Sequence, residues 1–199
     1  MPTIDEMVTK LTGSKFFSKF DLRKAYFQMG LAQKCRYLTA FNTPKGIYQW
    51  CVLNMGLSAS SEIFQKAIEE ILAGLPGQIS LSDDIIVYGK DEAEHDHNAM
   101  LVLKKLEEFG ITLNSEKCVF AAKELDFFGF HFSEQGISLT DEKYRALKEA
   151  PFPKDPKTLR SMLGLATYCE RAAIPNLAKL SIIKHLPNHA GQKHTQFLT

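Results

Sequence analysis

The chain has 199 residues, a length that fits one domain, or one domain and part of another. Hydrophobic residues make up 45% of the sequence and charged residues 24%, ordinary values for a globular protein with a sizeable core. Lysine and arginine number 24 and aspartate and glutamate 23, so the net charge neither supports nor excludes a nucleic-acid partner. Only a locally basic face could decide that question.

Cysteine usage and apolar patterning argue against two further classes of protein. The cysteines are widely spaced with no CxxC pair, which predicts reduced, mostly buried thiols of an intracellular protein rather than a disulfide framework or a zinc site. The four cysteines are Cys35, Cys51, Cys118 and Cys169. No apolar run approaches membrane-spanning length, and the start "MPTIDEMVTK" carries no signal-peptide pattern. We expect a soluble, intracellular chain with no membrane partner.

The first half of the chain reads as extended segments followed by a helix. Alternation of apolar and polar residues predicts a strand at 16–22. Further extended segments are predicted at 24–31, 36–43 and 48–53, with a turn at 43–46. A helix is predicted at 58–73, because Ile63, Ala67 and Ile71 recur at helical spacing and Gly74 and Pro76 end it.

The second half predicts two more strand pairs and three helices. Residues 78–90 read as strand, acidic turn and strand, and 124–139 as a hairpin turning near 134–136. Helices are predicted at 92–109, at about 141–149, and from Asp155–Pro156 to about Tyr168. The segment "PFPKDP" at 151–156 is the expected boundary. It divides a main α+β unit, 1–150, from a helical appendage, 151–172, and an irregular tail, 173–199.

Two adjacent aspartates stand in the strand-forming run "QISLSDDIIVYGK" at 78–90. Asp83 and Asp84 repel each other unless a cation lies near them, and strand interiors disfavour aspartate. They are either turn residues, since aspartate is common in turns, or ligands of a metal ion. Asp21 ends a second strand-like run, "FFSKFD". Three carboxylates at neighbouring strand ends would form a pocket suited to Mg²⁺, and paired metals are the usual device for phosphoryl transfer.

Histidines and phenylalanines outside this pocket have plainer interpretations. His95 and His97 are two residues apart and face different ways on a helix, so we expect solvated side chains rather than ligands. The phenylalanines at 127, 128, 130 and 132 could stack on bases, but alternating aromatics in a hairpin more often form core.

Several segments together resemble a known family. In order and spacing they are similar to the reverse transcriptases of long-terminal-repeat retroelements, most closely the Ty3/gypsy group, over most of residues 1–182. The segments are "FFSKFDLRKAYFQMGL", "TAFNTPKGIYQWCVLNMGLSASSEIFQ", "SLSDDIIVYGK", "HDHNAMLVLKKLEEFGITLNSEKCVF", "LDFFGFHFSEQGIS" and "LRSMLGLATYCERAAIPNLAKL". Departures from the family pattern are Leu81 at the usual aromatic position, "NMGLSASS" in the second segment and "ERAAIPN" in the last.

The resemblance implies a metal site. Asp21, Asp83 and Asp84 would hold two Mg²⁺ ions, with Mn²⁺ as a substitute, and the backbone carbonyl of Leu22 would add a ligand. With these two ions bound, the chain would add deoxynucleotides to a primer.

Further residues take roles by the same resemblance. Tyr26 would lie under the sugar of the incoming deoxynucleotide, and Gly56 would let the backbone approach that nucleotide. Lys117 would protonate the departing pyrophosphate. Phe128 and Gly129 would form the primer grip.

The resemblance also implies the fold and the partners. We expect an α+β palm, an antiparallel sheet backed by two helices, with partial fingers before it and the start of the thumb or connection after it. The partners would be an RNA or DNA template with its primer, the deoxynucleoside triphosphate, and other parts of a pol polyprotein such as ribonuclease H and integrase. The chain would be a polyprotein fragment lacking an upstream fingers segment, acting in the cytoplasm or a retroelement particle.

Two other functions stay open. A catalytically silent, polymerase-derived domain could bind nucleic acid or a protein, although three retained aspartates are costly without a metal. An unrelated Mg²⁺-dependent nuclease is a third interpretation, but it has no need of an aromatic residue five positions after Asp21.

Overall fold

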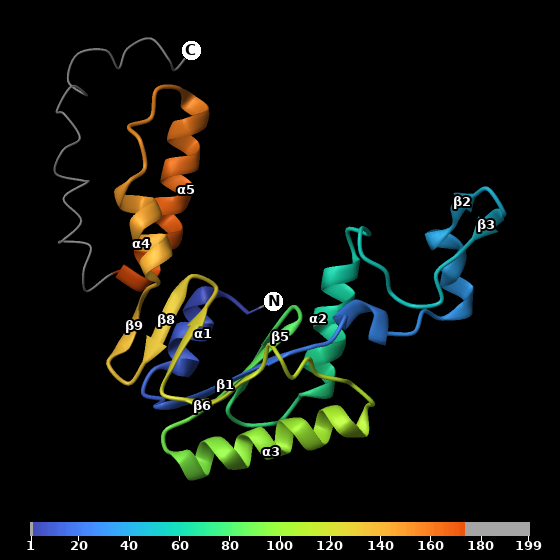
Figure 1. Cartoon of the computed structure of the whole chain (residues 1–199), viewed down its shortest axis with the longest axis horizontal. Helices are drawn as coiled ribbons and strands as arrows, with labels where there is room; N and C mark the ends of the chain where they lie inside the picture. Colours follow the sequence, from blue (N-terminus) through green and yellow to red (C-terminus); the bar gives the residue numbers. More distant parts are fainter. Residues whose placement is uncertain (1, 174–199) are drawn as a thin grey trace. The chain divides into compact units, whose positions relative to one another are not determined.

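The computed structural model describes residues 2–173, so the expected irregular tail at 173–199 lies almost entirely outside the described residues (Figure 1). The chain divides into two compact units. The first comprises 1–125 and 132–137, and the second comprises 126–131 and the residues from 138 onward. The boundary that the prolines at 151–156 predict stays a prediction.

A four-stranded antiparallel sheet organises the first unit. Its strands lie in the order β4-β5-β1-β6. Their bounds are β1 Phe16–Asp21, β4 Gln78–Leu81, β5 Asp84–Gly89 and β6 Val119–Ala122. The two central strands supply most of the sheet's buried apolar side chains, because Phe17, Phe20, Ile85, Ile86 and Val87 are almost completely buried.

Two helices supply the other half of this core. They are α2 (Ser60–Ile71), which packs on β4, and α3 (Glu92–Glu108), which runs along β5, β1 and β6 (Figure 1). The Asp91 side chain caps α3 by accepting from the backbone N–H of Glu94, and Gly110 follows its end at a positive φ of 67°. Phe64 and Ile68 of α2 and Val102 and Leu106 of α3 join the buried cluster. The predicted sheet backed by two helices is confirmed.

The segment between β1 and α2 differs from the expected extended conformation. Two 3₁₀ helices, η1 (Ala25–Gln28) and η2 (Gln33–Thr39), stand where we predicted extended chain. The short strands β2 (Phe41–Thr43) and β3 (Gly46–Tyr48) pair around the predicted turn, and their hairpin extends away from the central sheet (Figure 1). The strand predicted at 48–53 is wrong beyond Tyr48, apart from a bridge between Val52 and Gly30. Local bonds of the 3₁₀ type outcompete a weak alternating pattern here.

A three-stranded sheet follows, in the order β7-β8-β9. Its strands are β7 (Glu124–Phe127), β8 (Phe130–Ser133) and β9 (Gly136–Leu139). The predicted hairpin is β8 and β9. A first turn, at Phe128 and Gly129, was missed because Phe128 adopts a positive φ of 51° that its residue type does not suggest.

Three of the four phenylalanines expected in the core of this region are buried. They are Phe127, Phe130 and Phe132, whereas Phe128 is 49% exposed.

The remaining helices lie at the two ends of the described chain. They are α1 (Ile4–Leu11), α4 (Asp141–Lys148) and α5 (Pro156–Ala173). The prediction missed α1, whose start is a capping box between Thr3 and Glu6. The last two helices were predicted. Among residues 2–173, no helix has both the length and the apolar character that crossing a membrane requires.

Two side-chain expectations are wrong. His95 is not solvated: it is 2% exposed, and its Nε2 lies 2.9 Å from the Ser18 hydroxyl. The register of α3 against β1 decides this, since one face of the helix must be buried. His97 is exposed, as expected. The expectation of mostly buried thiols is also wrong for the three cysteines whose side chains are described, because Cys51 is exposed and Cys35 and Cys118 are partly exposed. The side chain of Cys169 lies outside the described residues.

Candidate active site

The two adjacent aspartates lie at a tight hairpin. Leu81 pairs with Asp84, so Ser82 and Asp83 form the turn between β4 and β5. Ser82 adopts a positive φ of 55°, and its N–H donates to the Gln65 side-chain oxygen over 2.8 Å. Gln65 also donates to the carbonyl of Ser80. The turn and metal-ligand interpretations are therefore compatible, because the same hairpin that accommodates the aspartates presents them.

Strand pairing brings the third aspartate to the same end of the sheet. Asp21 is the last residue of β1 and pairs directly with Asp84 of β5. The N–H of Leu22 donates to the carbonyl of Asp83 over 2.8 Å, which fixes the hairpin against the end of β1. The side chains of Asp21 and Asp84 are 15% and 18% exposed, whereas Asp83 is exposed to solvent.

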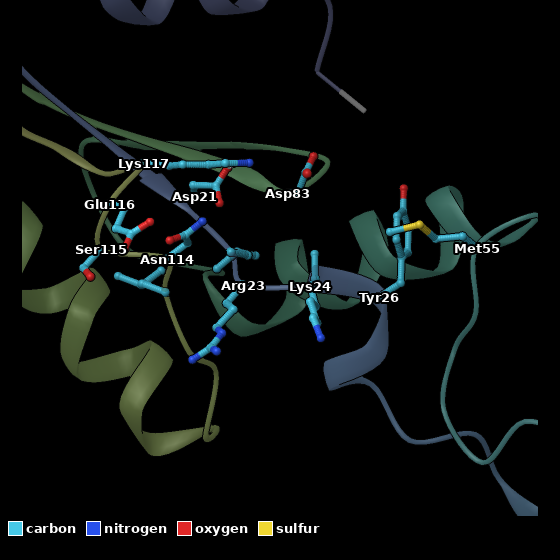
Figure 2. A pocket seen from close by; sticks show the side chains of 13 residues that line it. Asp21, Arg23, Lys24, Tyr26, Met55, Asp83, Asn114, Ser115, Glu116 and Lys117 are labelled. Atoms are coloured by element: carbon cyan, nitrogen blue, oxygen red, sulfur yellow. The ribbon is translucent and has the colours of Figure 1, made fainter.

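A loop after α3 forms one wall of the site. Leu113 bridges to Leu22, and the N–H of Asn114 donates to the carbonyl of Asp21 over 2.8 Å. Lys117, further along the loop, places its Nζ 4.0 Å from Oδ2 of Asp21. Figure 2 shows the Lys117 side chain extending past Asp21, with Asp83 on the neighbouring hairpin.

These segments enclose an open cavity of about 560 Å³. Its lining includes Asp21, Leu22, Arg23, Lys24, Ala25, Tyr26, Met55, Asp83, Leu113, Asn114, Ser115, Glu116 and Lys117 (Figure 2). Of the residues predicted for catalysis and nucleotide binding, five therefore share one cavity: Asp21, Leu22, Tyr26, Asp83 and Lys117.

Asp84 does not line this cavity but pairs with Asp21, which does. Its Oδ2 is 3.2 Å from Lys19 Nζ, and its buried Oδ1 has no hydrogen-bond partner. Burial raises the pKa of Asp84 above its ordinary value, Lys19 opposes the rise, and the charges of Asp83 and Asp21 add to it. An unpaired buried carboxylate oxygen is costly unless a cation satisfies it.

The donor set fits a hard divalent cation. Carboxylate and carbonyl oxygens are the ligands that Mg²⁺ prefers, and here they come from Asp21, Asp83, Asp84 and the backbone of Leu22. Within the described part of the chain, no three histidine, cysteine, aspartate or glutamate side chains already stand close enough together to hold an ion.

Tyr26 and Gly56 are placed by the segment between β1 and α2. Tyr26 belongs to η1, and its ring packs against Phe64 of α2 with the centroids 5.2 Å apart. Gly56 follows Met55, a lining residue, and adopts a positive φ of 95° that favours glycine. Gly56 itself does not line the cavity.

Phe128 and Gly129 belong to the second compact unit and line a cavity of their own, of about 640 Å³. The carbonyl of Gly129 accepts from the N–H of Thr140 over 3.1 Å. The ring of Phe128 meets that of Phe127 edge-on at 4.9 Å and is half exposed. The side chain of Lys143 lies where a Cβ on Gly129 would stand.

Most of the chain matches a known protein family. Residues 1–132 match the family described as reverse transcriptase (RNA-dependent DNA polymerase). The chain belongs to the reverse transcriptase family. The similarity proposed from the sequence segments is therefore confirmed.

Curated relatives of this reverse transcriptase family member are retrotransposon polyproteins. It is 35% identical over 170 residues to the retrovirus-related Pol polyprotein from transposon gypsy of Drosophila melanogaster, covering 84% of this chain and 16% of that protein. It is 31% identical over 183 residues to the transposon Tf2-3 polyprotein of Schizosaccharomyces pombe, covering 91% and 14%. The chain thus spans a small fraction of the length of these relatives.

Solved reverse transcriptases share the fold. The foamy viral protease-reverse transcriptase dRH in complex with double-stranded DNA is 26% identical, with a TM-score of 0.76, covering 89% of this chain and 31% of that one. The foamy viral protease-reverse transcriptase in complex with an RNA/DNA hybrid has a TM-score of 0.69, also at 26% identity, covering 81% and 22%. The α+β class expected from the sequence is confirmed.

Sequence reasoning missed several residues of this candidate site. Lys19 contacts Asp84, and Arg23, Lys24, Met55 and Asn114 line the main cavity. Arg23 and Lys24 follow directly after Leu22, and Asn114 opens the same "NSEK" run as Lys117, so proximity in sequence was the available signal. No signal in the sequence pointed to Lys19, because its contact with Asp84 depends on strand register.

Proposed function

We propose that this chain is the palm region of an RNA-directed DNA polymerase and adds deoxynucleotides to a primer. The observation that carries the proposal is the convergence of Asp21 and Asp83 on one cavity, with Asp84 paired beside them. In the proposed reaction the primer 3′-oxygen bonds to the α-phosphorus of a deoxynucleoside triphosphate, and the bond from that phosphorus to the pyrophosphate oxygen breaks.

Two Mg²⁺ ions, or Mn²⁺ in their place, would be held by Asp21, Asp83, Asp84 and the carbonyl of Leu22. Such ions supply activation of the attacking hydroxyl and neutralisation of the charge on the leaving group. The buried Oδ1 of Asp84, which lacks a partner, supports this assignment.

Other residues of the chain would bind and orient the substrates. Lys117, 4.0 Å from Asp21, would give a proton to the departing pyrophosphate. Tyr26, braced by Phe64, would lie under the nucleotide sugar, and Gly56 would leave room for backbone contact with the nucleotide. Phe128 and Gly129 would hold the primer end, which the exposed ring of Phe128 supports.

The proposed partners are an RNA or DNA template with its primer and the deoxynucleoside triphosphate. The foamy viral relatives were solved with double-stranded DNA or an RNA/DNA hybrid, which supports a duplex substrate. Because the curated relatives are polyproteins, we also propose ribonuclease H and integrase regions as companions, acting in the cytoplasm or in a retroelement particle. The palm would occupy 1–150 and the start of the thumb or connection 151–172.

Primer extension on an oligo-primed RNA template with Mg²⁺ or Mn²⁺ tests the proposal. We expect extension by the unmodified chain and a loss of about 100-fold or more with Asp83→Asn. Asp83 is exposed in a turn, so its variant should fold normally. Glu107→Gln, which removes an exposed charge from α3, is the matched control and should extend normally. A folded chain that binds primer–template but extends nothing would instead support the catalytically silent alternative.

A further inference from the structure

The side chain of Gln28, the last residue of η1, uses its whole hydrogen-bonding capacity. Its Nε2 donates to the carbonyl of Arg23 over 2.7 Å and to the carbonyl of Thr112 over 3.1 Å. Its Oε1 accepts from the backbone N–H of Thr112 over 2.7 Å and from the Thr112 hydroxyl over 3.1 Å. Two donors and two acceptors are all that a glutamine amide has.

The three bonds to Thr112 join parts of the chain that are 84 residues apart. Arg23 lies just beyond the end of β1, and Thr112 begins the loop that runs to Lys117. The N–H of Arg23 also donates to the carbonyl of Thr112. The Gln28 amide bonds to both of these residues, so the three residues form a closed ring of hydrogen bonds. That ring lies two residues from both the Asp21 carbonyl and the Asn114 N–H that donates to it.

The loop held in this way carries the wall of the main cavity. Leu113, Asn114 and Lys117 all line it, and the Lys117 ammonium reaches Asp21 only at 4.0 Å. The lysine side chain is 68% exposed, so packing does little to position it. Its placement depends on the backbone of the loop. Thr112, Leu113 and Asn114 of the loop pair with the last residue of β1 and the two residues after it.

We infer that Gln28 is a positioning residue: by clamping Thr112 to Arg23 it holds the 112–117 loop, and with it Lys117, against Asp21. The inference deepens the proposed polymerase function and rests on it for its kinetic consequence. Gln28 is not among the residues that line the main cavity. Its effect on the reaction passes through the loop, since misplacing a reacting group by about 1 Å can cost about 100-fold in rate.

The first test needs no activity. Hydrogen exchange of the 112–117 amides is compared between the unmodified chain and Gln28→Met, which keeps the side-chain length and removes all four bonds. We expect exchange about ten times faster in that segment, and unchanged exchange in β5. Gln78→Met is the matched control, because Gln78 donates to the carbonyl of Leu72 away from the cavity. Unchanged exchange at 112–117 in Gln28→Met overturns the inference.

The second test separates positioning from loss of stability. In primer extension, Gln28→Met should lower kcat/KM for the deoxynucleotide by about 10-fold while the Kd for primer–template stays the same. If Gln28 acts through Lys117, the double variant Gln28→Met/Lys117→Met should be no slower than Lys117→Met alone. Losses that multiply in the double variant would overturn the inference.

The outcomes distinguish the inference from the proposed function. Accelerated exchange in a chain that never extends a primer would leave the clamp standing and remove the polymerase proposal. An active chain in which Gln28→Met changes neither the hydrogen exchange of the 112–117 loop nor the kinetics would remove the clamp and leave the polymerase proposal standing. Gln28→Glu adds a check, because its carboxylate can still accept from Thr112 but cannot donate to either carbonyl, so it should resemble Gln28→Met rather than the unmodified chain.

Discussion

Lys19 and Asp84 form an ion pair across neighbouring strands, with Nζ 3.2 Å from Oδ2, while Oδ1 of the same carboxylate is buried without a partner. The two side chains lie on β1 and β5, two pairs apart in the register. Lys19 thus pairs with one oxygen of the Asp84 carboxylate and leaves the other oxygen without a hydrogen-bond partner. This arrangement costs stability in the free chain and is suited to a cation that completes it.

Asp84→Asn should stabilise the metal-free chain at neutral pH. Burial raises the pKa of Asp84, so the folded state binds this proton more tightly than the unfolded state. Ionisation of Asp84 therefore costs stability at pH 7, and the cost disappears as the pH falls through the raised pKa to below the ordinary aspartate value. We expect a gain in unfolding free energy of about 0.5–1 kcal/mol at pH 7 that vanishes near pH 3.5, measured by urea denaturation in EDTA.

Asp83→Asn is the control for this experiment. Asp83 is exposed in the turn, so its variant should stay within about 0.5 kcal/mol of the unmodified chain. If Asp84→Asn is instead less stable at pH 7, the attraction to Lys19 outweighs the cost of burial, and the sign of the argument is wrong.

Mg²⁺ should raise the unfolding free energy of the unmodified chain. An ion that binds only the folded state stabilises it by about 2.7 kcal/mol at a concentration 100 times its Kd. Thermal denaturation in increasing MgCl₂, at constant ionic strength, should show this stabilisation. It should be largely lost in Asp21→Asn, whose side chain lines the cavity. Equal stabilisation of both proteins would place the bound ions elsewhere.

Tyr26→Ala should relax discrimination between deoxyribonucleotides and ribonucleotides by about 10-fold or more. The proposed role of the ring is steric, since it would exclude a 2′-hydroxyl from the sugar position. Single-nucleotide incorporation of dNTP and rNTP gives the ratio of kcat/KM values. Tyr26→Phe retains the ring packed on Phe64 and should discriminate as the unmodified chain does. Relaxed discrimination in Tyr26→Phe would show that the hydroxyl, not the ring, is responsible.

Ser18→Ala should destabilise the first unit by about 1–3 kcal/mol, because it leaves two partners of the hydroxyl unsatisfied. The Ser18 Oγ is fully buried, accepts from the N–H of Ala121 over 3.0 Å, and lies 2.9 Å from Nε2 of His95. Urea denaturation measures the change. Ser61→Ala, at an exposed position of α2, should change stability by less than about 0.5 kcal/mol. Similar values for both variants would mean that the buried bonds contribute nothing net.

Where the sequence predicted structure well, the signal was local and strong. The spacing of Ala99, Val102 and Leu106 together with Gly110 defined α3, because a helix buries one face and ends where a residue accepts a positive φ. The prediction from the sequence failed at η1 and at the turn of Phe128. There the conformation depends on short-range hydrogen bonds or on a strained φ that the residue types do not predict.

The fold class, the family and the three aspartates as candidate metal ligands follow from the sequence alone, since periodicity and ordered motifs are properties of the chain. Which side chains face each other is visible only in the folded structure. The pairing of Asp21 with Asp84, the contact of Lys19 with Asp84, and the clamp of Gln28 on Thr112 join residues 63 or more positions apart. Such contacts follow from strand register and loop packing, which are set by burial of the whole core rather than by any local pattern.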